Sequence, residues 1–292
     1  MSELIMFDKF KNRLELTGIL TTVTALRISA GRSSEPIGSD LPVVKDALNQ
    51  PLIPGASFKG AMRSRLESFL RGINQNWAED PAEFTSKARN ETIKGLKEKY
   101  KEDDKALTNA ILNQTDLVSR LFGSPWIASK FQVRDLTVVK DTWFNQYQER
   151  DGVAIERDTE TAGSGKLYDF QVVPAGTEFD FKAVVENSES WERGLLMIGL
   201  HQFESEQITL GGGSSRGLGV VSLELNKMQW FDSEGDAKKL LEYMENQVNQ
   251  TMGDYQYSTQ EDIDILKREW SEHLINHLYT ELDKAVVKQP SN

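Results

Sequence analysis

The chain has 292 residues, which is long enough for one large domain with additions or for two small ones. It contains no cysteine and no apolar run of membrane-spanning length, so disulfides, thiolate metal sites and a membrane span are excluded and we expect a cytoplasmic protein. The net charge of −11 argues against a nucleic-acid-binding surface over the whole molecule, but residues 1–72 are net basic and the acidity lies in residues 131–292.

The first predicted elements are a strand over residues 13–26 and a helix over residues 56–72. The strand is rich in β-branched residues, and the helix has Ser57 as its predicted N-cap. Lys59 and Arg63 lie four residues apart on one helix face, so the helix start combines a hydroxyl, backbone N–H groups and two cations that suit a phosphate. An ordinary capped amphipathic helix with solvated basic residues is the simpler interpretation. The apolar face comprises Phe58, Met62, Leu66, Phe69 and Leu70.

The rest of the chain predicts an α+β protein. Residues 73–120 are polar, charged and weakly amphipathic, which indicates a helical insertion on the main domain. Periodicity predicts strands over residues 131–139, 177–187 and 220–225 and a helix over residues 191–203. The resulting order is that of the ferredoxin-like (RRM-like) βαββαβ core, which is built on an antiparallel sheet.

The C-terminal part predicts an acidic helical tail. We expect a main domain over residues 1–232 and a C-terminal helical extension over residues 233–292. His273 and His277 lie four apart in this tail, but they lack a third ligand, so we expect packed histidines and identify no metal site. The apolar stripe of the tail comprises Ile263, Leu266, Trp270, Leu274 and Leu278.

A glycine-rich loop spans residues 210–219. It runs from a helix into a strand and lacks the G-K-[ST] ending, so it is not a nucleotide-binding P-loop. Its small residues allow another backbone to approach closely, and Arg216 is available for a phosphate. A flexible loop that ends the second helix is the alternative interpretation.

Asp40 precedes Leu41 and Pro42 and therefore lies in an extended or turning segment. A carboxylate in a loop is by default a solvated charge or the first residue of an Asx turn. Asp46 is a nearby alternative for any carboxylate chemistry, although we expect it to form the turn before Ala47.

Two strings of residues resemble the RAMP superfamily: G-S-D-L-P-V-V-K-D at residues 38–46 and P-L-I-P-G-A-S-F-K-G-A-M-R-S at residues 51–64. A third match runs from residue 152 to residue 176, and L-F-G at residues 121–123 resembles a short segment of the same family. The closest resemblance is to the repeated backbone subunit of type III CRISPR effector complexes, with the III-D branch as one candidate. It covers residues 13–72 and 121–225.

The resemblance implies a chain that binds a CRISPR guide RNA in a filament with other RAMP subunits and the large subunit of the complex. It implies that Asp40 is the catalytic residue that cleaves the paired target RNA, aided by a divalent cation such as Mg²⁺. It also implies that residues 143–176 form a projecting thumb hairpin, in which Ile155, Leu167 or Tyr168 would wedge into the duplex. A solvated β-ribbon is the alternative for this hairpin. The RNA-binding residues expected are Ser57, Lys59, Arg63, Gly212, Ser214 and Arg216.

Three functions therefore compete. The first is a metal-dependent endoribonuclease subunit that acts within the assembled complex in antiviral defence. The second is a structural subunit of the same complex that binds guide RNA and neighbouring subunits without cleaving. The third is a free-standing ferredoxin-like module that binds RNA or protein, which would need neither the thumb nor the segment at residues 51–64 and would carry base-stacking aromatics on its strands.

Overall fold

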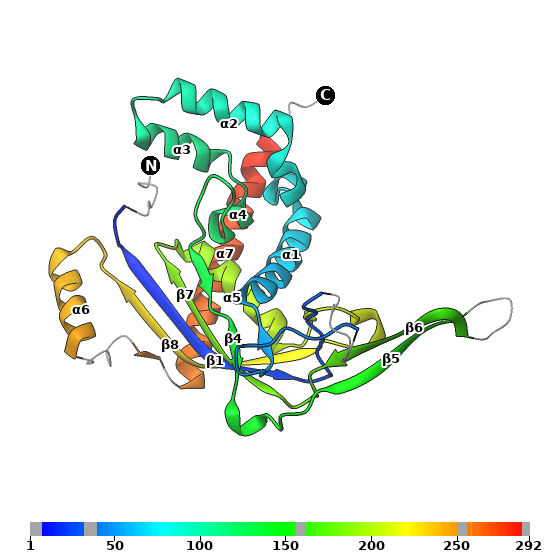
Figure 1. Cartoon of the computed structure of the whole chain (residues 1–292). Coiled ribbons are helices and arrows are strands. Elements are labelled where there is room, and N and C mark those ends of the chain that lie inside the picture. The colour runs from blue at the N-terminus through cyan, green and yellow to red at the C-terminus, as the bar shows by residue number, and fades with distance from the viewer. Residues whose placement is uncertain (1–7, 32–39, 156–161, 250–255, 258, 288–292) are drawn as a thin grey trace.

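The computed structural model describes residues 8–31, 40–155, 162–249, 256–257 and 259–287. Its centre is an antiparallel sheet in which β1 (Asn12–Thr22) lies between β7 (Glu178–Glu186) and β8 (Val221–Asp232) (Figure 1). The strand order over the described residues is β2-β4-β7-β1-β8-β9, and β3 also pairs with β7. The shorter strands are β2 (Leu52–Ile53), β3 (Phe131–Val133), β4 (Leu136–Val138) and β9 (Gln256–Tyr257).

Alternation along the central strands decides which face of the sheet is buried. In β1 the even-numbered residues are buried and the odd-numbered ones are partly exposed, whereas in β7 the odd-numbered residues are buried and the even-numbered ones are partly or fully exposed. The buried side chains include Leu14, Leu16, Phe179 and Phe181, all of which are fully buried. The opposite face of β1 and β7 carries charged, hydroxyl and aliphatic residues and no aromatic one.

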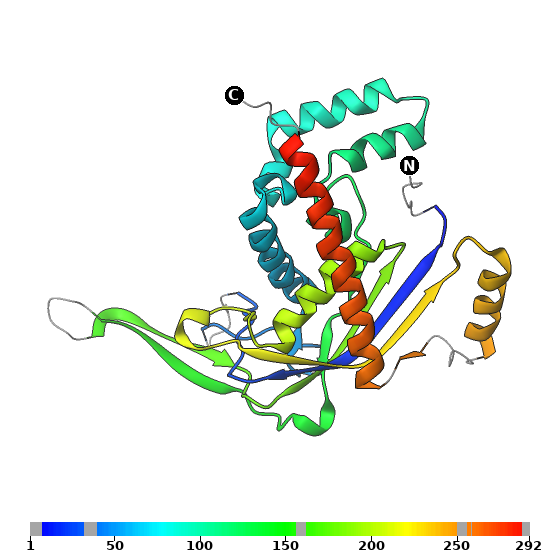
Figure 2. The same ribbon diagram turned by 180° about the vertical axis from the view of Figure 1, so that it is seen from behind.

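Three helices cover the buried face: α1 (Gly55–Ile73), α5 (Ser190–Glu204) and α7 (Gln260–Val287) (Figure 2). Phe58 of α1 stacks on Phe203 of α5 with ring centroids 4.2 Å apart, and it meets Phe181 of the sheet at 5.1 Å. These contacts join both helices to the sheet, because aromatic rings bury a large apolar area at one point. Phe69 lies outside this core, since 38% of it is exposed.

The α7 helix packs directly on α5. A Cβ atom at Gly194 would lie 2.1 Å from the carbonyl oxygen of Trp270, so only glycine allows the two helices to approach this closely. Four of the five residues of the predicted stripe of the tail are buried here in the same hydrophobic cluster as the sheet, and the fifth, Leu266, is partly buried against it. The α7 helix therefore extends the core of the main domain and does not build a core of its own. A shorter helix, α6 (Ala237–Asn249), lies beside the end of β8.

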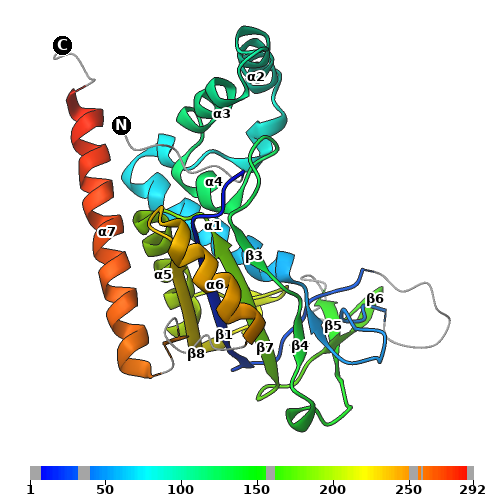
Figure 3. The ribbon, with the colours of Figure 1, turned by 90° about the vertical axis from the view of Figure 1, so that its left-hand side faces the viewer.

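Most of residues 75–122 are helical, and the sequence predicts a helical insertion over residues 73–120. The 3₁₀ turns Gln75–Trp77 and Pro81–Thr85 are followed by α2 (Lys87–Lys99), α3 (Asp104–Asn113) and α4 (Leu117–Phe122). The α2 and α3 helices stand beyond the end of α1, away from the sheet (Figure 3). Ile111, Leu112 and Leu117 of this segment are buried.

A two-stranded antiparallel hairpin projects from the sheet, as Figure 1 shows. It consists of β5 (Gln148–Ile155) and β6 (Ala162–Val172) and follows the 3₁₀ turn Lys140–Thr142. The resemblance to the RAMP superfamily implies a projecting hairpin within residues 143–176, and β5 and β6 lie within that range. The long pairing register of the hairpin explains how it forms without a strong local pattern.

Three strand predictions need correction. The strand predicted over residues 13–26 ends at Thr22, and Leu26 and Arg27 form only isolated β-bridges. The strand predicted over residues 131–139 is interrupted between β3 and β4, where Asp135 turns its side chain to the backbone N–H of Gly55. The last strand does not end at residue 225 but continues to Asp232, because β1 pairs with it along its whole length. With these changes, the antiparallel order β8-β1-β7-β4 is consistent with the ferredoxin-like arrangement. Within the described part of the chain, no helix is both long and apolar enough to span a bilayer.

Candidate RNA-binding and cleavage site

Asp40 lies on an exposed segment that runs along the base of the hairpin. Its backbone N–H donates to Oδ1 of Asp169 at 2.8 Å, and the next carbonyl, of Leu41, accepts from the N–H of Gln171 at 3.1 Å. Leu41 also forms a parallel β-bridge with Phe170. The main chain at Asp40 is therefore attached to β6, while its carboxylate faces solvent.

Asp46, the alternative carboxylate, forms a turn. Its Oδ1 accepts from the backbone N–H groups of Leu48 and Gln50, each at 2.8 Å. This is the turn-forming role that the sequence favours for this residue, and it occupies the carboxylate with local structure.

The start of α1 differs from the prediction that Ser57 is its N-cap. The helix begins at Gly55, its N-cap residue Pro54 makes no side-chain bond, and the N–H of Gly55 donates to Oδ1 of Asp135 at 2.8 Å. The N–H of Ser57 donates to the carbonyl of Pro54. A carboxylate from a distant loop thus already occupies the anion-binding end of this helix. Only the tertiary fold brings Asp135 here.

Lys59 points back into the protein. Its Nζ donates to Oγ of Ser129 at 2.6 Å and to the carbonyl of Phe131 at 2.9 Å, which takes two of its three donors. Burial, and to a lesser extent the charge of Arg63, lower the pKa of Lys59 to about 8, so the ammonium is still mostly charged at pH 7.

Arg63 joins α1 to α4 and to the L-F-G turn. Its guanidinium donates to Glu67 at 2.7 Å, to the carbonyl of Gly123 at 2.9 Å and to Oγ of Ser119 at 3.0 Å. These contacts take three of its five N–H donors. The primary role of Lys59 and Arg63 is therefore to hold α1 against residues 119–131, and each keeps donors for a further ligand.

The backbone that lies close against the glycine-rich loop is that of Arg27 in the same chain. A Cβ atom at Gly211 would lie 2.0 Å from the carbonyl oxygen of Arg27, and φ at Gly211 is +74°, so glycine is required twice over. The N–H of Gly212 donates to that same carbonyl at 2.8 Å and is not available to a phosphate. Ser214 and Arg216 lie in the exposed 3₁₀ turn Ser214–Arg216.

Arg216 and Tyr168 connect this loop to the hairpin. Nη1 of Arg216 donates to the hydroxyl of Tyr168 at 3.3 Å, and both residues lie at the hairpin base. Tyr168 packs on Gly152 of the facing strand, where any Cβ would meet its ring. The side chains of Ile155 and Leu167, the other predicted wedge residues, lie outside the described part of the structure.

Arg27 is a site residue that the sequence did not single out. Its guanidinium carbon lies 4.6 Å from the centre of the Phe170 ring, and its Nε is buried with no hydrogen-bond partner among the described residues. Its backbone pairs with the glycine-rich loop at Gly211, and the N–H of Val44 donates to the carbonyl of the next residue, Ile28. Arg27 thus lies where that loop, the Asp40 segment and the hairpin meet. The available signal was a single cation between two apolar residues at the end of a predicted strand.

Of the histidines, His277 is packed, as the sequence predicts, whereas His201 and His273 are exposed. The His277 ring stacks on Trp191 at 4.5 Å, and burial lowers the pKa of its imidazole. Over the described residues, no group of three or more His, Cys, Asp and Glu side chains could hold a metal ion.

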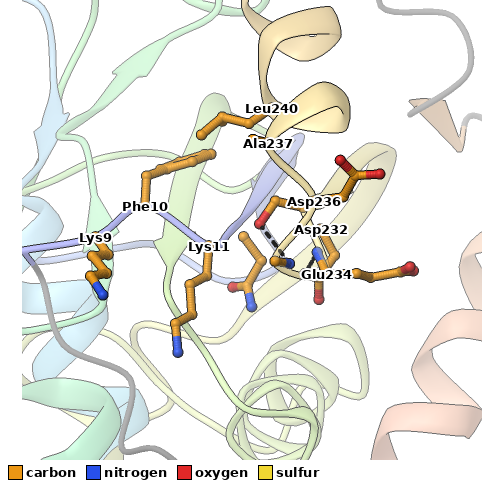
Figure 4. Close-up of a pocket in the computed structure, with 11 residues that line it drawn as sticks. Lys9, Phe10, Lys11, Asp232, Glu234, Asp236, Ala237 and Leu240 are labelled. Carbon is orange, nitrogen blue, oxygen red and sulfur yellow. Dashed lines mark hydrogen bonds between the residues drawn. The ribbon is translucent and has the colours of Figure 1, made fainter.

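A pocket of about 730 Å³ lies away from these residues, between the start of β1 and the turn that leads from β8 into α6 (Figure 4). Lys9 and Lys11 line one side, and three carboxylates line the other. Asp232 accepts from the N–H of Glu234, and Asp236 caps α6 through the N–H of Lys238. These carboxylates stabilise the turn and the helix start, and no candidate residue named above lines the pocket.

Comparison with known proteins adds independent evidence. The model of the RAMP superfamily matches residues 19–222, which is more than half of the chain. The chain is 25% identical to a protein named CRISPR system Cms endoribonuclease Csm3 from Enterococcus italicus, over 78% of this chain and 98% of that protein. It is 26% identical to the protein of the same name from Streptococcus thermophilus, over 81% and 98%, and 23% identical to that from Methanocaldococcus jannaschii, over 78% and 88%. The matched region includes the last four residues of β1, the Asp40 segment, α1, the hairpin and the glycine-rich loop, and the chain belongs to the RAMP superfamily.

Proposed function

We propose that this chain is a guide-RNA-binding backbone subunit of a type III CRISPR effector complex and cleaves the paired target RNA with Asp40. The observation that carries the proposal is the attachment of the Asp40 segment to the base of the projecting hairpin. The similarity to three proteins named Csm3 endoribonuclease, each covered over most of its length, supports the same function. Assignment to the III-D branch remains a prediction from the sequence.

In this proposal the β5–β6 hairpin is the thumb. It enters the paired guide and target, and Ile155, Leu167 or Tyr168 fills the space that a displaced base leaves. Displacement of a base distorts the adjacent backbone and can bring a 2′-hydroxyl in line with its phosphate. Asp40 lies beside the hairpin base and would take the proton of that hydroxyl as a general base, while the 2′-oxygen bonds to phosphorus and the 5′-oxygen of the next nucleotide leaves and takes a proton from water.

In this proposal the phosphates of the guide RNA are bound by Arg27 and Arg216. Ser57, Ser214 and the remaining donors of Lys59 and Arg63 add hydrogen bonds. Phosphate contacts of this kind fix the position of an RNA without reading its sequence, which a subunit that accepts any guide requires. Arg27 has the most direct support of these, because its Nε is buried with no hydrogen-bond partner among the described residues.

A divalent ion such as Mg²⁺ fits the donors available at Asp40. Mg²⁺ prefers oxygen ligands and commonly uses one or two carboxylates together with phosphate oxygens of the substrate, so a preformed cluster of protein ligands is not needed. The Asp40 carboxylate and the scissile phosphate would hold the ion, which would stabilise negative charge during cleavage.

The alternative subunit would bind the same RNA and the same neighbours but would not cleave. The exposed carboxylate of Asp40 favours the subunit that cleaves. The free-standing module has less support. The open face of β1 and β7 presents residues such as Arg13, Thr17 and Lys182 and no aromatic side chain for stacking bases.

The test is to produce the chain together with the other subunits of its complex and to analyse the RNA that purifies with it. RNA of discrete length, and cleavage of a complementary target at regular intervals, are expected. A chain that purifies alone and free of RNA under these conditions would exclude both complex-subunit functions and leave the free-standing module.

Guide-RNA affinity should depend on Arg27 and Arg216. We expect Arg27→Gln combined with Arg216→Ala to weaken binding of unrelated RNA sequences equally. The slope of log K against log salt should fall by roughly 1.4, because each phosphate contact on a single strand contributes about 0.7. Fluorescence titrations at several salt concentrations measure both quantities. Arg268→Ala, an exposed arginine on α7, is the matched control, and an equal effect of the control would contradict the assignment.

A further inference from the structure

Three consecutive residues of β6 contact three different parts of the candidate site. Tyr168 accepts from Arg216 of the glycine-rich loop at 3.3 Å. Asp169 accepts from the backbone N–H of Asp40 at 2.8 Å. Phe170 lies under the guanidinium of Arg27 at 4.6 Å. This short segment therefore sets how the hairpin, the glycine-rich loop and the Asp40 segment lie relative to one another.

Asp169 is the member of this segment that acts on Asp40. The two residues are 129 positions apart in the chain, so their contact is a product of the fold. Hydrogen bonds to an ionised carboxylate are shorter and stronger than those between neutral groups. With the N–H of Asp40 held by Asp169 and the carbonyl of Leu41 held by Gln171, the main chain is fixed on both sides of the Asp40 side chain.

The hairpin itself does not explain an aspartate at this position. In the register of β5 and β6, Asp169 lies directly opposite Asp151. Like charges directly opposite each other destabilise a pair of strands, whereas most other residues at position 169 would avoid this cost. Asp169 therefore lowers the stability of the hairpin, and its hydrogen bond goes to the Asp40 segment and not to the other hairpin strand.

We propose that Asp169 is a positioning residue for RNA cleavage, which holds the backbone of Asp40 so that its carboxylate meets the target RNA at a set place beside the hairpin. This inference rests on the proposed function of Asp40. Asp169 touches neither the RNA nor the reacting atoms, and it acts through its hydrogen bond to the N–H of Asp40. A side chain that keeps a hydrogen-bond acceptor at position 169 should therefore serve in its place.

The test compares Asp169→Ala, Asp169→Asn and Asp151→Ala in the assembled complex under single-turnover conditions with saturating target RNA. We expect Asp169→Ala to lower the cleavage rate by roughly 10- to 100-fold, the range expected when a reacting group is displaced by about 1 Å. Target binding should stay within about twofold, and the melting temperature should be unchanged or higher because the like-charge pair is removed. Asp169→Asn keeps an acceptor oxygen and should cleave within about threefold of the wild-type rate.

Asp151→Ala is the matched control, since it removes the facing carboxylate without touching Asp40, and it should cleave at the wild-type rate. Wild-type cleavage by Asp169→Ala would overturn the proposal. Equal losses in Asp169→Asn and Asp169→Ala would overturn it too, because the negative charge and not the acceptor would then matter. Loss of assembly or of target binding by Asp169→Ala would show a purely structural role. If Asp40→Ala still cleaves, the proposed function itself fails, whatever the Asp169 variants do.

Discussion

We expect Asp40→Ala to abolish target-RNA cleavage by the assembled complex, with a loss of at least about 10²- to 10⁴-fold, the usual contribution of a general base. Assembly, guide binding and target binding should be retained. The side chain is exposed and the contacts of residue 40 with β6 are made by its backbone, so truncation opens no cavity and breaks no packing. The measurement is a time course of end-labelled target RNA with Mg²⁺, resolved by fragment length.

Asp46→Asn is the matched control for this result. It lies in the same segment, and its amide oxygen can still accept from the N–H groups of Leu48 and Gln50. We expect it to cleave at the wild-type rate. EDTA should stop cleavage by wild type and by Asp46→Asn. If Asp40→Ala and Asp46→Asn both cut at the same sites and rate as wild type, the chain is the non-cleaving subunit. If Asp46→Asn loses cleavage and Asp40→Ala does not, the carboxylate is Asp46.

The largest effect on stability is expected from Glu192→Ala. Glu192 and Lys130 form a buried ion pair in which Nζ of Lys130 lies 2.7 and 2.6 Å from the two carboxylate oxygens, and Glu192 is 1% exposed. Burial raises the pKa of the Glu192 carboxyl, and the Lys130 charge opposes that rise. Removing the carboxylate would leave a buried ammonium without its counter-ion, which costs about 3–5 kcal/mol. Urea unfolding followed by circular dichroism measures this loss.

The control for this prediction is the double variant Lys130→Met with Glu192→Leu. Replacing both charges by apolar side chains removes the desolvation cost as well as the attraction, so we expect it to be clearly more stable than Glu192→Ala. A single variant that is as stable as the double variant would mean that water reaches Lys130. Because the pair joins the segment before β3 to the start of α5, its loss should also loosen the contacts of Lys59 with Ser129 and Phe131.

Local periodicity is sufficient to predict the strands around β1 and β7 and the helices α1 and α5, because the side chains that face the core recur every second residue or every third to fourth one. It fails where a distant residue changes the local structure. The strand over residues 131–139 is interrupted because Asp135 bonds to the start of α1, and Ser57 loses its capping role for the same reason. Neither change leaves a signal within a window of ten residues.

The sequence by itself determined the family, through the strings around Asp40 and Lys59, and it determined the α+β class through alternating and helical patterns. It could also place Asp40 in a loop, because the following proline excludes a helix there. Only the tertiary structure decided what surrounds that loop. Asp169 meets Asp40 across 129 positions of the chain, Arg27 meets the glycine-rich loop, and α7 docks on α5 at Gly194. Such contacts depend on the packing of whole elements against a shared core, and short-range residue preferences carry no information about which distant side chain will be the partner.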